Sequence, residues 1–238
     1  MKGLILAGGR GTRLEPLTKI TNKHLLPVYD RPMIFYALRT LRLAGIHEIM
    51  IITSGEHAGD FLQVLGSGEE FGVRFTFEIQ DKPLGIGHAV GLAEKFSEKE
   101  NLAVILGDNI FADDFSQELK SFKEGARVFL KKVPDPERFG VPRFKNEKIV
   151  EFIEKPKKAP CNYALTGLYV FDHLVFDFIR NLKPSLRGEL EITEVNNYYL
   201  KTNKLSHSIV KDFWSDAGTF DSLIRSAKYV QKNLAKFK

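Results

Sequence analysis

The chain has 238 residues, the length of one large α/β domain, of which 43% are hydrophobic and 27% charged. It has no apolar run of about 18 residues and no secretory signal, and its only cysteine, Cys161, excludes an internal disulfide and a cysteine-based metal site, so we expect a cytoplasmic protein outside the membrane. The net charge is +5, but lysines and glutamates alternate over most of the chain, and this lack of a basic cluster argues against nucleic-acid binding. A modest positive charge also suits an enzyme that acts on phosphates.

The first predicted element is a buried strand at residues 2–7, which runs directly into the glycine-rich residues 8–13. Glycines let backbone N–H groups approach an anion, and the arginine that follows them offers a planar set of donors for phosphate oxygens. The loop continues past Lys23 before a helix begins near Pro32, which is far longer than an ordinary strand-to-helix connection. Because its spacing fits neither a P-loop nor a dinucleotide fingerprint, we predict a different phosphate-binding loop, with Arg13 and Lys23 as the cationic contacts.

Helices and strands then alternate as far as residue 106. We expect helices at residues 32–45, 60–65 and 87–96, and strands at 48–53, 73–80 and 102–106. Beyond residue 125, strand patterns at 127–133, 140–144, 148–153 and 162–171 are separated by short loops, which indicates antiparallel pairing. Helices at 174–181 and 189–202, a strand at 205–210 and a last helix reaching residue 236 complete the chain. This order predicts a three-layer, Rossmann-like α/β fold with a mixed, mainly parallel sheet, helices on both faces and a smaller antiparallel portion.

Two acidic residues stand at glycine-rich turns. Asp108 follows a buried strand, where α/β sheets bind ligands, and Asp216 lies in a turn before the last helix. Each turn alone could be purely structural, but together the two carboxylates suit Mg²⁺ among phosphates. Lys155 and Arg187 form a second basic pair, as a reaction between two phosphorylated substrates would need.

In order and spacing, these segments resemble the glucose-1-phosphate thymidylyltransferases, a group of sugar nucleotidyltransferases. The segments that carry the resemblance are Leu6-Ala7-Gly8-Gly9, Lys23-His24-Leu25-Leu26-Pro27, Leu106-Gly107-Asp108-Asn109, Asp135-Pro136-Glu137-Arg138-Phe139-Gly140, Glu154-Lys155-Pro156, Thr166-Gly167-Leu168-Tyr169, Arg187-Gly188-Glu189-Leu190-Glu191-Ile192-Thr193 and Trp214 to Thr219. The resemblance implies Mg²⁺-dependent transfer from dTTP to glucose 1-phosphate, which yields dTDP-glucose and pyrophosphate for deoxysugar synthesis of the dTDP-rhamnose type. It also implies one domain over residues 1–238, with the nucleotide part mainly at 1–125 and the sugar-phosphate part mainly at 126–215.

The resemblance also implies roles for individual residues. The nucleotide-binding residues would be Leu6, Gly8, Gly9, Gly11, Thr12, Arg13, Lys23, Gln80, Gly85 and Asp108. The sugar-phosphate-binding residues would be Asn109, Phe139, Gly140, Glu154, Lys155, Leu165, Tyr169, Arg187 and Trp214. Arg13, Lys23, Asp108 and Asp216 would be catalytic, and the two aspartates would hold Mg²⁺. We expect dTTP and glucose 1-phosphate as small-molecule partners and a homo-oligomer.

Some positions depart from the family pattern. Phe139 stands where Tyr is common, Leu165 stands where Val is common, and residues 82–88 differ from the better-known sequence beside the base. The sequence ends at Lys238, without the C-terminal helical extension of longer members, so we expect no effector site or subunit contact built from it. A UTP-using enzyme or one that accepts several sugar phosphates therefore stays open, as does a non-catalytic regulatory subunit that binds sugar nucleotides.

Overall fold

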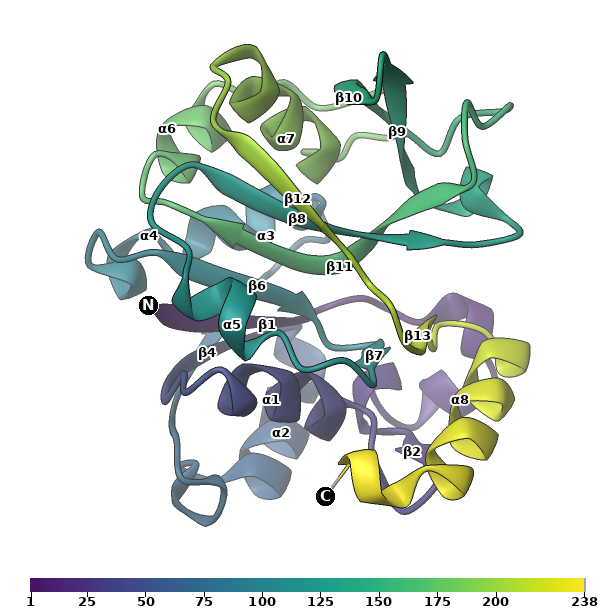
Figure 1. The fold of residues 1–238 in the computed structure, drawn as a ribbon. Helices are drawn as coiled ribbons and strands as arrows, with labels where there is room; N and C mark the ends of the chain where they lie inside the picture. The colour runs from purple at the N-terminus through teal and green to yellow at the C-terminus, as the bar shows by residue number, and fades with distance from the viewer. Residues whose placement is uncertain (238) are drawn as a thin grey trace.

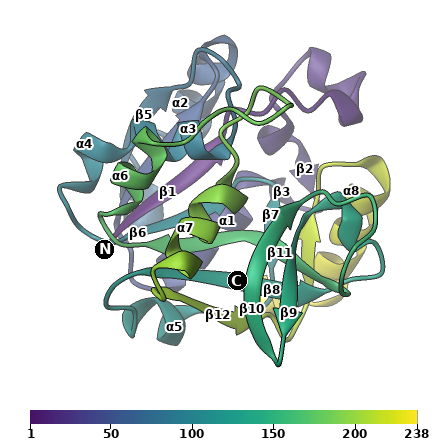
Figure 2. The ribbon, with the colours of Figure 1, turned by 90° about the horizontal axis from the view of Figure 1, so that it is seen from above.

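Seven strands form the central sheet of the computed structural model, which describes residues 1–237. Their order across the sheet is β12-β8-β11-β6-β1-β4-β5 (Figures 1 and 2). The strands are β1 (Lys2–Ala7), β4 (Glu48–Thr53), β5 (Arg74–Ile79), β6 (Leu102–Leu106), β8 (Ala126–Lys132), β11 (Tyr163–Phe171) and β12 (Leu205–Ile209). The apolar patterns in the sequence predicted the two ends of each of these strands to within one residue.

The sheet is mixed and mainly parallel, as the sequence predicts. β6, β1, β4 and β5 pair in parallel, whereas β11 pairs antiparallel with both β6 and β8, and β12 is parallel to β8. β8 and β12 therefore run in the same direction as β1, and among the described strands of this sheet only β11 is reversed. The separate antiparallel portion is the pair β9 (Gly140–Lys145) and β10 (Lys148–Glu154).

This antiparallel portion is smaller than the strand patterns after residue 125 indicate. β8 returns to the direction of β6 because a short helix, α5 (Ser116–Lys120), lies between them, and the sequence pattern did not predict that helix. A helical crossover can bring the next strand back parallel to the first, as it does for β8 after β6. β12 follows β11 through α6 (Val175–Arg180) and α7 (Ile192–Lys201), but it pairs in parallel with β8 and so runs opposite to β11.

Helices cover both faces of the sheet and make the fold three-layered (Figure 1). One apolar cluster joins one face to α1 (Ile34–Leu43), α2 (Ala58–Leu65) and α5, and a second cluster joins the other face to α3 (Ile86–Leu92), α6 and α7. β1 shows the division, because Ile5 belongs to the first cluster and Leu4 to the second. Successive side chains of a strand point to opposite faces, so one buried strand supports both layers.

Two predicted helices differ in extent. The helix expected at 87–96 is interrupted at Ala93, whose ψ of 4° separates α3 from α4 (Glu94–Ser97). The last helix, α8 (Phe220–Lys232), ends before a 3-10 turn at Leu234–Phe237, which brings Phe237 within 5.5 Å of the Tyr36 ring. The chain after α8 thus packs against α1.

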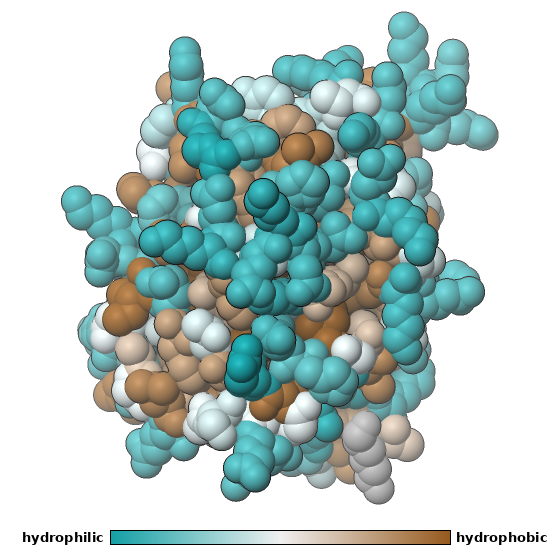
Figure 3. Space-filling model, turned by 90° about the vertical axis from the view of Figure 1, so that its left-hand side faces the viewer, coloured by the Kyte–Doolittle hydropathy of each residue, from teal (hydrophilic) through white to brown (hydrophobic). Residues whose placement is uncertain are grey.

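Two very short strand pairs complete the fold. β2 (Pro27–Val28) pairs with β3 (Arg31–Pro32), and β7 (Asn109–Phe111) pairs with β13 (Trp214–Asp216). The face shown in Figure 3 is covered mostly by hydrophilic side chains, between which hydrophobic ones form small separate groups. Within residues 1–237, no helix is long and apolar enough to cross a membrane.

Candidate active site

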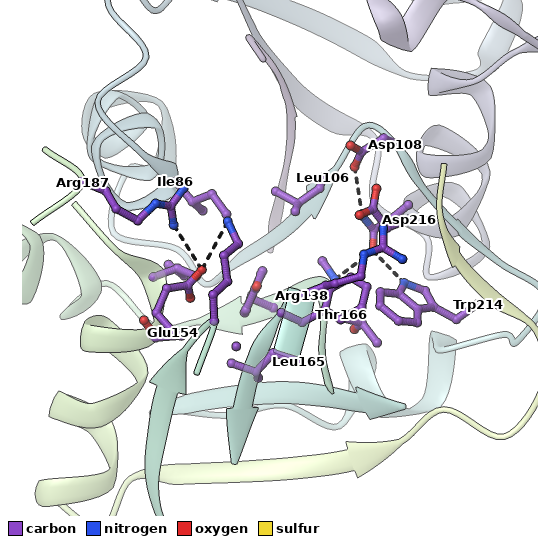
Figure 4. Close-up of a pocket in the computed structure, with 18 of the residues that line it drawn as sticks. Ile86, Leu106, Asp108, Arg138, Glu154, Leu165, Thr166, Arg187, Trp214 and Asp216 are labelled. Carbon is purple, nitrogen blue, oxygen red and sulfur yellow. Dashed lines mark hydrogen bonds and ion pairs between the residues drawn. The ribbon is translucent and has the colours of Figure 1, made fainter. Parts of the chain in front are cut away.

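The carboxyl ends of β1 and β6 face a cleft that consists of two adjoining cavities. The large cavity has a volume of about 480 Å³ and the small cavity about 240 Å³. Ile86, Leu106 and Asp108 line both, so the two cavities meet beside Asp108. Figure 4 shows the large cavity, with Asp108 and Asp216 next to each other on one side and Glu154 and Arg187 on the other. This edge of the sheet is where open α/β folds bind their ligands.

The small cavity brings together most of the residues expected to bind a nucleotide. Those that line it are Leu6, Gly8, Gly9, Lys23, Gln80, Gly85 and Asp108. Thr12 lines a neighbouring outer cavity of about 530 Å³, which shares Gly8, Gly9 and Gln80 with the small one. Arg13 lines the large cavity instead.

Gly11 lines none of these three cavities, but its backbone conformation explains why a glycine stands at this position. Its φ is +68°, and a Cβ there would lie 2.9 Å from Cβ of Lys23. Gly85 has φ +99°, and a Cβ there would lie 2.7 Å from the main-chain oxygen of Leu190. Both positions therefore need glycine, the first to fold the loop under Lys23 and the second to let two loops touch.

Lys23 and Asp108 form a buried ion pair between the two cavities. The Lys23 ammonium donates to Oδ2 of Asp108, and Nδ2 of Asn109 donates to Oδ1 at 3.0 Å. Burial alone would raise the pKa of Asp108, but the charge of Lys23 and these hydrogen bonds outweigh it and hold that pKa well below its usual range. Asp108 is therefore ionised at neutral pH.

His24 also lines the small cavity, although its sequence context predicted no role for it. Burial, followed by the charge of Lys23, lowers the pKa of His24 to about 3, so the ring is neutral. Oδ1 of Asn22 accepts from the His24 main-chain N–H at 3.0 Å and lies 2.7 Å from Nδ1. Because that oxygen is an acceptor, Nδ1 carries the proton of the neutral ring. His24 falls in the segment Lys23–Pro27 that carries the family resemblance, but that resemblance implied no role for it.

Asp216 is brought to the junction by the pairing of β13 with β7, in which it stands opposite Asn109. Its Oδ2 lies 3.9 Å from the Arg13 guanidinium, and the Ala217 main-chain N–H donates to the Asp108 main-chain oxygen at 2.9 Å. Burial and then the negative charge of Asp108 raise the pKa of Asp216, against the pull of Lys23 and Arg13. Two neighbouring carboxylates that repel each other favour a cation between them.

The donor set at this junction fits Mg²⁺. Within residues 1–237 there is no group of three His, Cys, Asp or Glu side chains that could hold a metal ion. Asp108 and Asp216 supply two carboxylates, and Mg²⁺ commonly takes one or two carboxylates while phosphate oxygens and water complete its six positions. A Mg²⁺ ion held by these two residues would therefore need phosphate oxygens and water for its other positions.

All the residues expected to bind the sugar phosphate line the large cavity, and Asn109 organises one wall of it. Oδ1 of Asn109 accepts from the Gly167 main-chain N–H at 2.8 Å and from Nε1 of Trp214 at 2.7 Å. The Trp214 indole also packs against the Phe139 ring, with centroids 5.2 Å apart. Through these two hydrogen bonds Asn109 of β7 is joined to β11 and β13, and it sets the position of the indole. Its Nδ2 also donates to Asp108, which links this wall to the ion pair.

The opposite wall of the large cavity carries charged side chains. Oε1 of Glu154 lies 3.7 Å from Nζ of Lys155 and 3.5 Å from the Arg187 guanidinium. Burial raises the pKa of Glu154; Lys155 and Arg187 oppose this rise and Glu191 adds to it. The two cations expected to hold a sugar phosphate thus lie together, already paired with acids.

Several lining residues were not assigned a role from the sequence. In the large cavity they are Ile86, Leu106, Arg138, Thr166, Gly167, Ile192 and Thr193, and in the small cavity they are His24, Pro83, Ile86, Ala89, Leu106 and Glu189. Arg138 pairs with Asp135 at 2.6 Å and lies over the Phe139 ring. Many of these residues fall inside the segments that carry the family resemblance, so those segments did contain the signal.

Comparison with known proteins points to one family. The nucleotidyl transferase family model matches residues 2–233. The chain is 45% identical over 238 residues to the glucose-1-phosphate thymidylyltransferase of Neisseria meningitidis serogroup A. This match covers 97% of this chain and 83% of that protein. A Bacillus anthracis crystal structure, proposed to be such an enzyme and solved with a sucrose, has 53% identity and a TM-score of 0.92 over 97% of this chain and 95% of that one.

A crystal structure of UDP-glucose pyrophosphorylase with UDP-glucose is also similar. It has 25% identity and a TM-score of 0.85, and the match covers 97% of this chain and 98% of that one. The family model and the N. meningitidis relative both extend over nearly the whole chain. The chain therefore belongs to the glucose-1-phosphate thymidylyltransferase family of nucleotidyltransferases.

Proposed function

We propose that the cleft transfers the thymidylyl group of dTTP to glucose 1-phosphate, releasing pyrophosphate and forming dTDP-glucose. Family membership supports this reaction. The observation that carries the proposal is that cationic side chains from distant parts of the chain converge on one cleft, around two carboxylates. They are Arg13, Lys23, Lys155 and Arg187, around Asp108 and Asp216.

In this proposal the small cavity binds the nucleotide. The backbone at Gly8 and Gly9 approaches the triphosphate, and Arg13 and Lys23 stabilise the pyrophosphate as it leaves. Gln80 would read the base, since its side-chain amide is held by the Gly85 main-chain oxygen at 3.3 Å and lies 2.9 Å from Nδ1 of His88. These two contacts use both N–H groups of the amide, so Oε1 would be the group that accepts a hydrogen bond from the pyrimidine edge.

The large cavity would bind glucose 1-phosphate, with Lys155 and Arg187 on its phosphate. Glu154 and the main chain at Gly140 and Leu165 would contact the sugar hydroxyls. Tyr169 and Trp214 would form the walls, and both are largely buried in the fold. A pocket that combines apolar walls with a few fixed polar groups is typical of a small-molecule site.

The chemistry we propose is a single in-line displacement. An oxygen of glucose 1-phosphate attacks the α-phosphorus of dTTP, a new P–O bond forms, and the bond to pyrophosphate breaks. A phosphate monoester has a second pKa of about 6, so this oxygen is already mostly ionised at neutral pH and needs no general base. The protein's task is to bring two anions together, which the convergent cations achieve by positioning and charge neutralisation.

Asp108 and Asp216 would hold Mg²⁺ in this scheme. When bound there, the ion would neutralise charge on the transferring phosphate. Lys23 already neutralises Asp108 in the structure, so a positive charge is compatible with this position. The metal requirement is tested by repeating the assay below with excess EDTA, which should abolish turnover, and then restoring MgCl₂.

The decisive experiment is a pyrophosphate-release assay that crosses dTTP, UTP, CTP, ATP and GTP with several hexose 1-phosphates. We expect the highest kcat/KM for dTTP with glucose 1-phosphate. A higher value for UTP would favour the uridylyltransferase alternative. No pyrophosphate from any pair, combined with measurable binding of dTDP-glucose, would favour the non-catalytic subunit.

Three further expectations go with this proposal. The product would feed deoxysugar synthesis of the dTDP-rhamnose type, the chain would form a homo-oligomer, and the first part of the chain would bind mainly nucleotide. The last division is not strict, because Arg13 and Ile86 belong to the first part and line the large cavity. Light scattering of the purified protein would test the oligomer.

A further inference from the structure

Arg187, which the proposed function assigns to the sugar phosphate, is surrounded by three carboxylates. Its guanidinium lies 3.0 Å from Oε1 of Glu189 and 3.5 Å from an oxygen of each of Glu154 and Glu191. Lys155 adds one more cation beside Glu154. Three carboxylates against two cations leave one net negative charge, which opposes the binding of a phosphate dianion. One of these acids has to release its cation before the phosphate can bind well.

Glu189 is the carboxylate best placed to do so. Its side chain is 33% exposed, against 23% for Glu154 and 9% for Glu191. Glu191 is also fixed, because its Oε1 accepts from the Ser185 hydroxyl at 2.8 Å. No hydrogen bond or ion pair within residues 1–237 other than that with Arg187 holds the Glu189 carboxylate, so it can turn toward solvent at little cost.

Glu189 also belongs to the other cavity. It lines the small cavity together with Gly85 and Ile86. The main chain next to it is docked on that cavity's edge, because the Leu190 N–H donates to the Leu84 oxygen at 2.8 Å and the Gly87 N–H donates to the Leu190 oxygen at 2.9 Å. The backbone is thus anchored beside the nucleotide, while the side chain reaches toward the sugar-phosphate site.

We propose that Glu189 is a positioning residue that couples the two cavities: it pairs with Arg187 before the nucleotide binds and releases Arg187 to the sugar phosphate once a nucleotide fills the small cavity. This inference rests on the proposed function. In the proposed function the base lies against Gly85, and a Cβ on Gly85 would lie 3.0 Å from Cβ of Glu189, so a bound nucleotide crowds the Glu189 side chain. Its triphosphate, which remains negatively charged even with one Mg²⁺ bound, also adds negative charge to the cavity that Glu189 lines. The released guanidinium can then take the phosphate in a bidentate hydrogen-bonded pair.

The test is a calorimetric titration of glucose 1-phosphate into the wild type, Glu189→Gln and Glu189→Ala. Each titration is done alone and with saturating thymidine 5′-(α,β-imido)triphosphate and MgCl₂. For the wild type, we expect the analogue to tighten the Kd for glucose 1-phosphate by about fivefold or more, within the usual range of coupling between sites. Both variants should bind glucose 1-phosphate more tightly than the wild type without the analogue, and their Kd should change less than twofold when it is added.

Glu151→Gln is the matched control, because Glu151 forms a comparable exposed pair with Arg143 at 2.8 Å outside the cleft. It should keep the wild-type coupling. Unchanged coupling in both Glu189 variants, beside normal thymidylyl transfer by the wild type, would overturn the coupling role alone. Absence of glucose 1-phosphate binding by the wild type, with and without the analogue, would overturn it together with the proposed function.

Discussion

The two cavities of the cleft are built in different ways. The small cavity is shaped largely by main chain and apolar side chains, with Gly8, Gly9 and Gly85 where a side chain would intrude. The large cavity is shaped by side chains from β7, β10, β11 and β13, held by the Asn109 amide on one wall and by an acid–base cluster on the other. One surface is set by backbone conformation and the other by side-chain chemistry.

This difference indicates how each cavity responds to change. Where backbone makes the surface, a substitution must strain the chain, so affinity and folding stability fall together. Where side chains make it, a substitution can alter one hydrogen bond or one charge and leave the fold intact. We therefore expect nucleotide binding to be sensitive to structural perturbation and sugar binding to be open to adjustment.

The largest expected effect is at the junction, which serves both cavities. Asp216→Asn should lower kcat by about 100-fold or more, because it removes a charge that we assign to the metal and the reacting phosphates. The melting temperature should not fall, because this carboxylate already has a raised pKa and gains little from ionisation. Pyrophosphate release and thermal melts measure the two quantities.

Asp60→Asn, an exposed change on α2, is the control and should alter neither quantity. Asp108→Asn should also abolish turnover, but it leaves the buried Lys23 ammonium without its partner and should cost stability as well. A kcat for Asp216→Asn near that of the wild type would contradict the metal assignment.

The second prediction concerns the backbone of the small cavity. Gly85→Ala combines a φ of +99° with a Cβ that would lie 2.7 Å from the Leu190 oxygen. We expect it to lower the free energy of unfolding by about 2 kcal/mol and to raise the KM for dTTP by roughly tenfold. Gly72→Ala is the matched control, since φ is +65° there but nothing lies within 4 Å of the added Cβ. It should cost about 1 kcal/mol and leave the KM for dTTP unchanged.

The third prediction concerns a single hydrogen bond of the large cavity. Trp214→Phe removes the donor to Oδ1 of Asn109 but keeps an aromatic ring beside Phe139. The loss of about 1 kcal/mol should raise the KM for glucose 1-phosphate about fivefold and leave the KM for dTTP unchanged. Tyr229→Phe, which removes a hydroxyl donor to Asp212 outside the cleft, should change neither KM. Equal increases in both KM values for Trp214→Phe would argue against separate cavities.

The sequence predicted the strands well because their signal is local. Buried apolar runs such as those of β1, β4 and β6 reveal both their length and their burial. The pairing of β7 with β13 was not predicted, because strands of three residues are too short to show a period and their partners lie about a hundred positions apart. This pairing sets Asp216 opposite Asn109, so the closeness of the two aspartates became visible only in the structure.

The site was predicted as a set of residues rather than as an arrangement. The resemblance implied that Arg13 and Lys23 act together on the pyrophosphate, but it did not show that Arg13 would line the large cavity beside Asp216 while Lys23 pairs with Asp108. The three acids around Arg187 were present in the sequence, but their distances to the guanidinium depend on how two loops dock. The net charge around Arg187 therefore could not be predicted from the sequence.

The smallest effect we predict tests whether the acids of the two cavities differ in their electrostatics. The pKa of Glu154 in the folded chain is raised, chiefly by burial and further by Glu191, although Lys155 and Arg187 oppose the rise. A raised pKa means that the folded chain binds this proton more tightly than the unfolded chain does. The resulting stabilisation is complete below the ordinary glutamate pKa of 4.5 and is lost as the pH rises through the folded-state pKa.

Glu154→Gln should therefore match the wild type in stability near pH 4 and become the more stable protein as the pH rises toward 8. Urea unfolding at pH 4, 6 and 8 would measure this gap, with Glu151→Gln as the exposed control. A gap that stays constant would mean that folding leaves the pKa of Glu154 unchanged, and a gap that favours the wild type as the pH rises would mean that Glu154 is stabilised by its charge, as Asp108 is by Lys23. The two cavities would then hold their acids in the same way, and only the backbone would distinguish them.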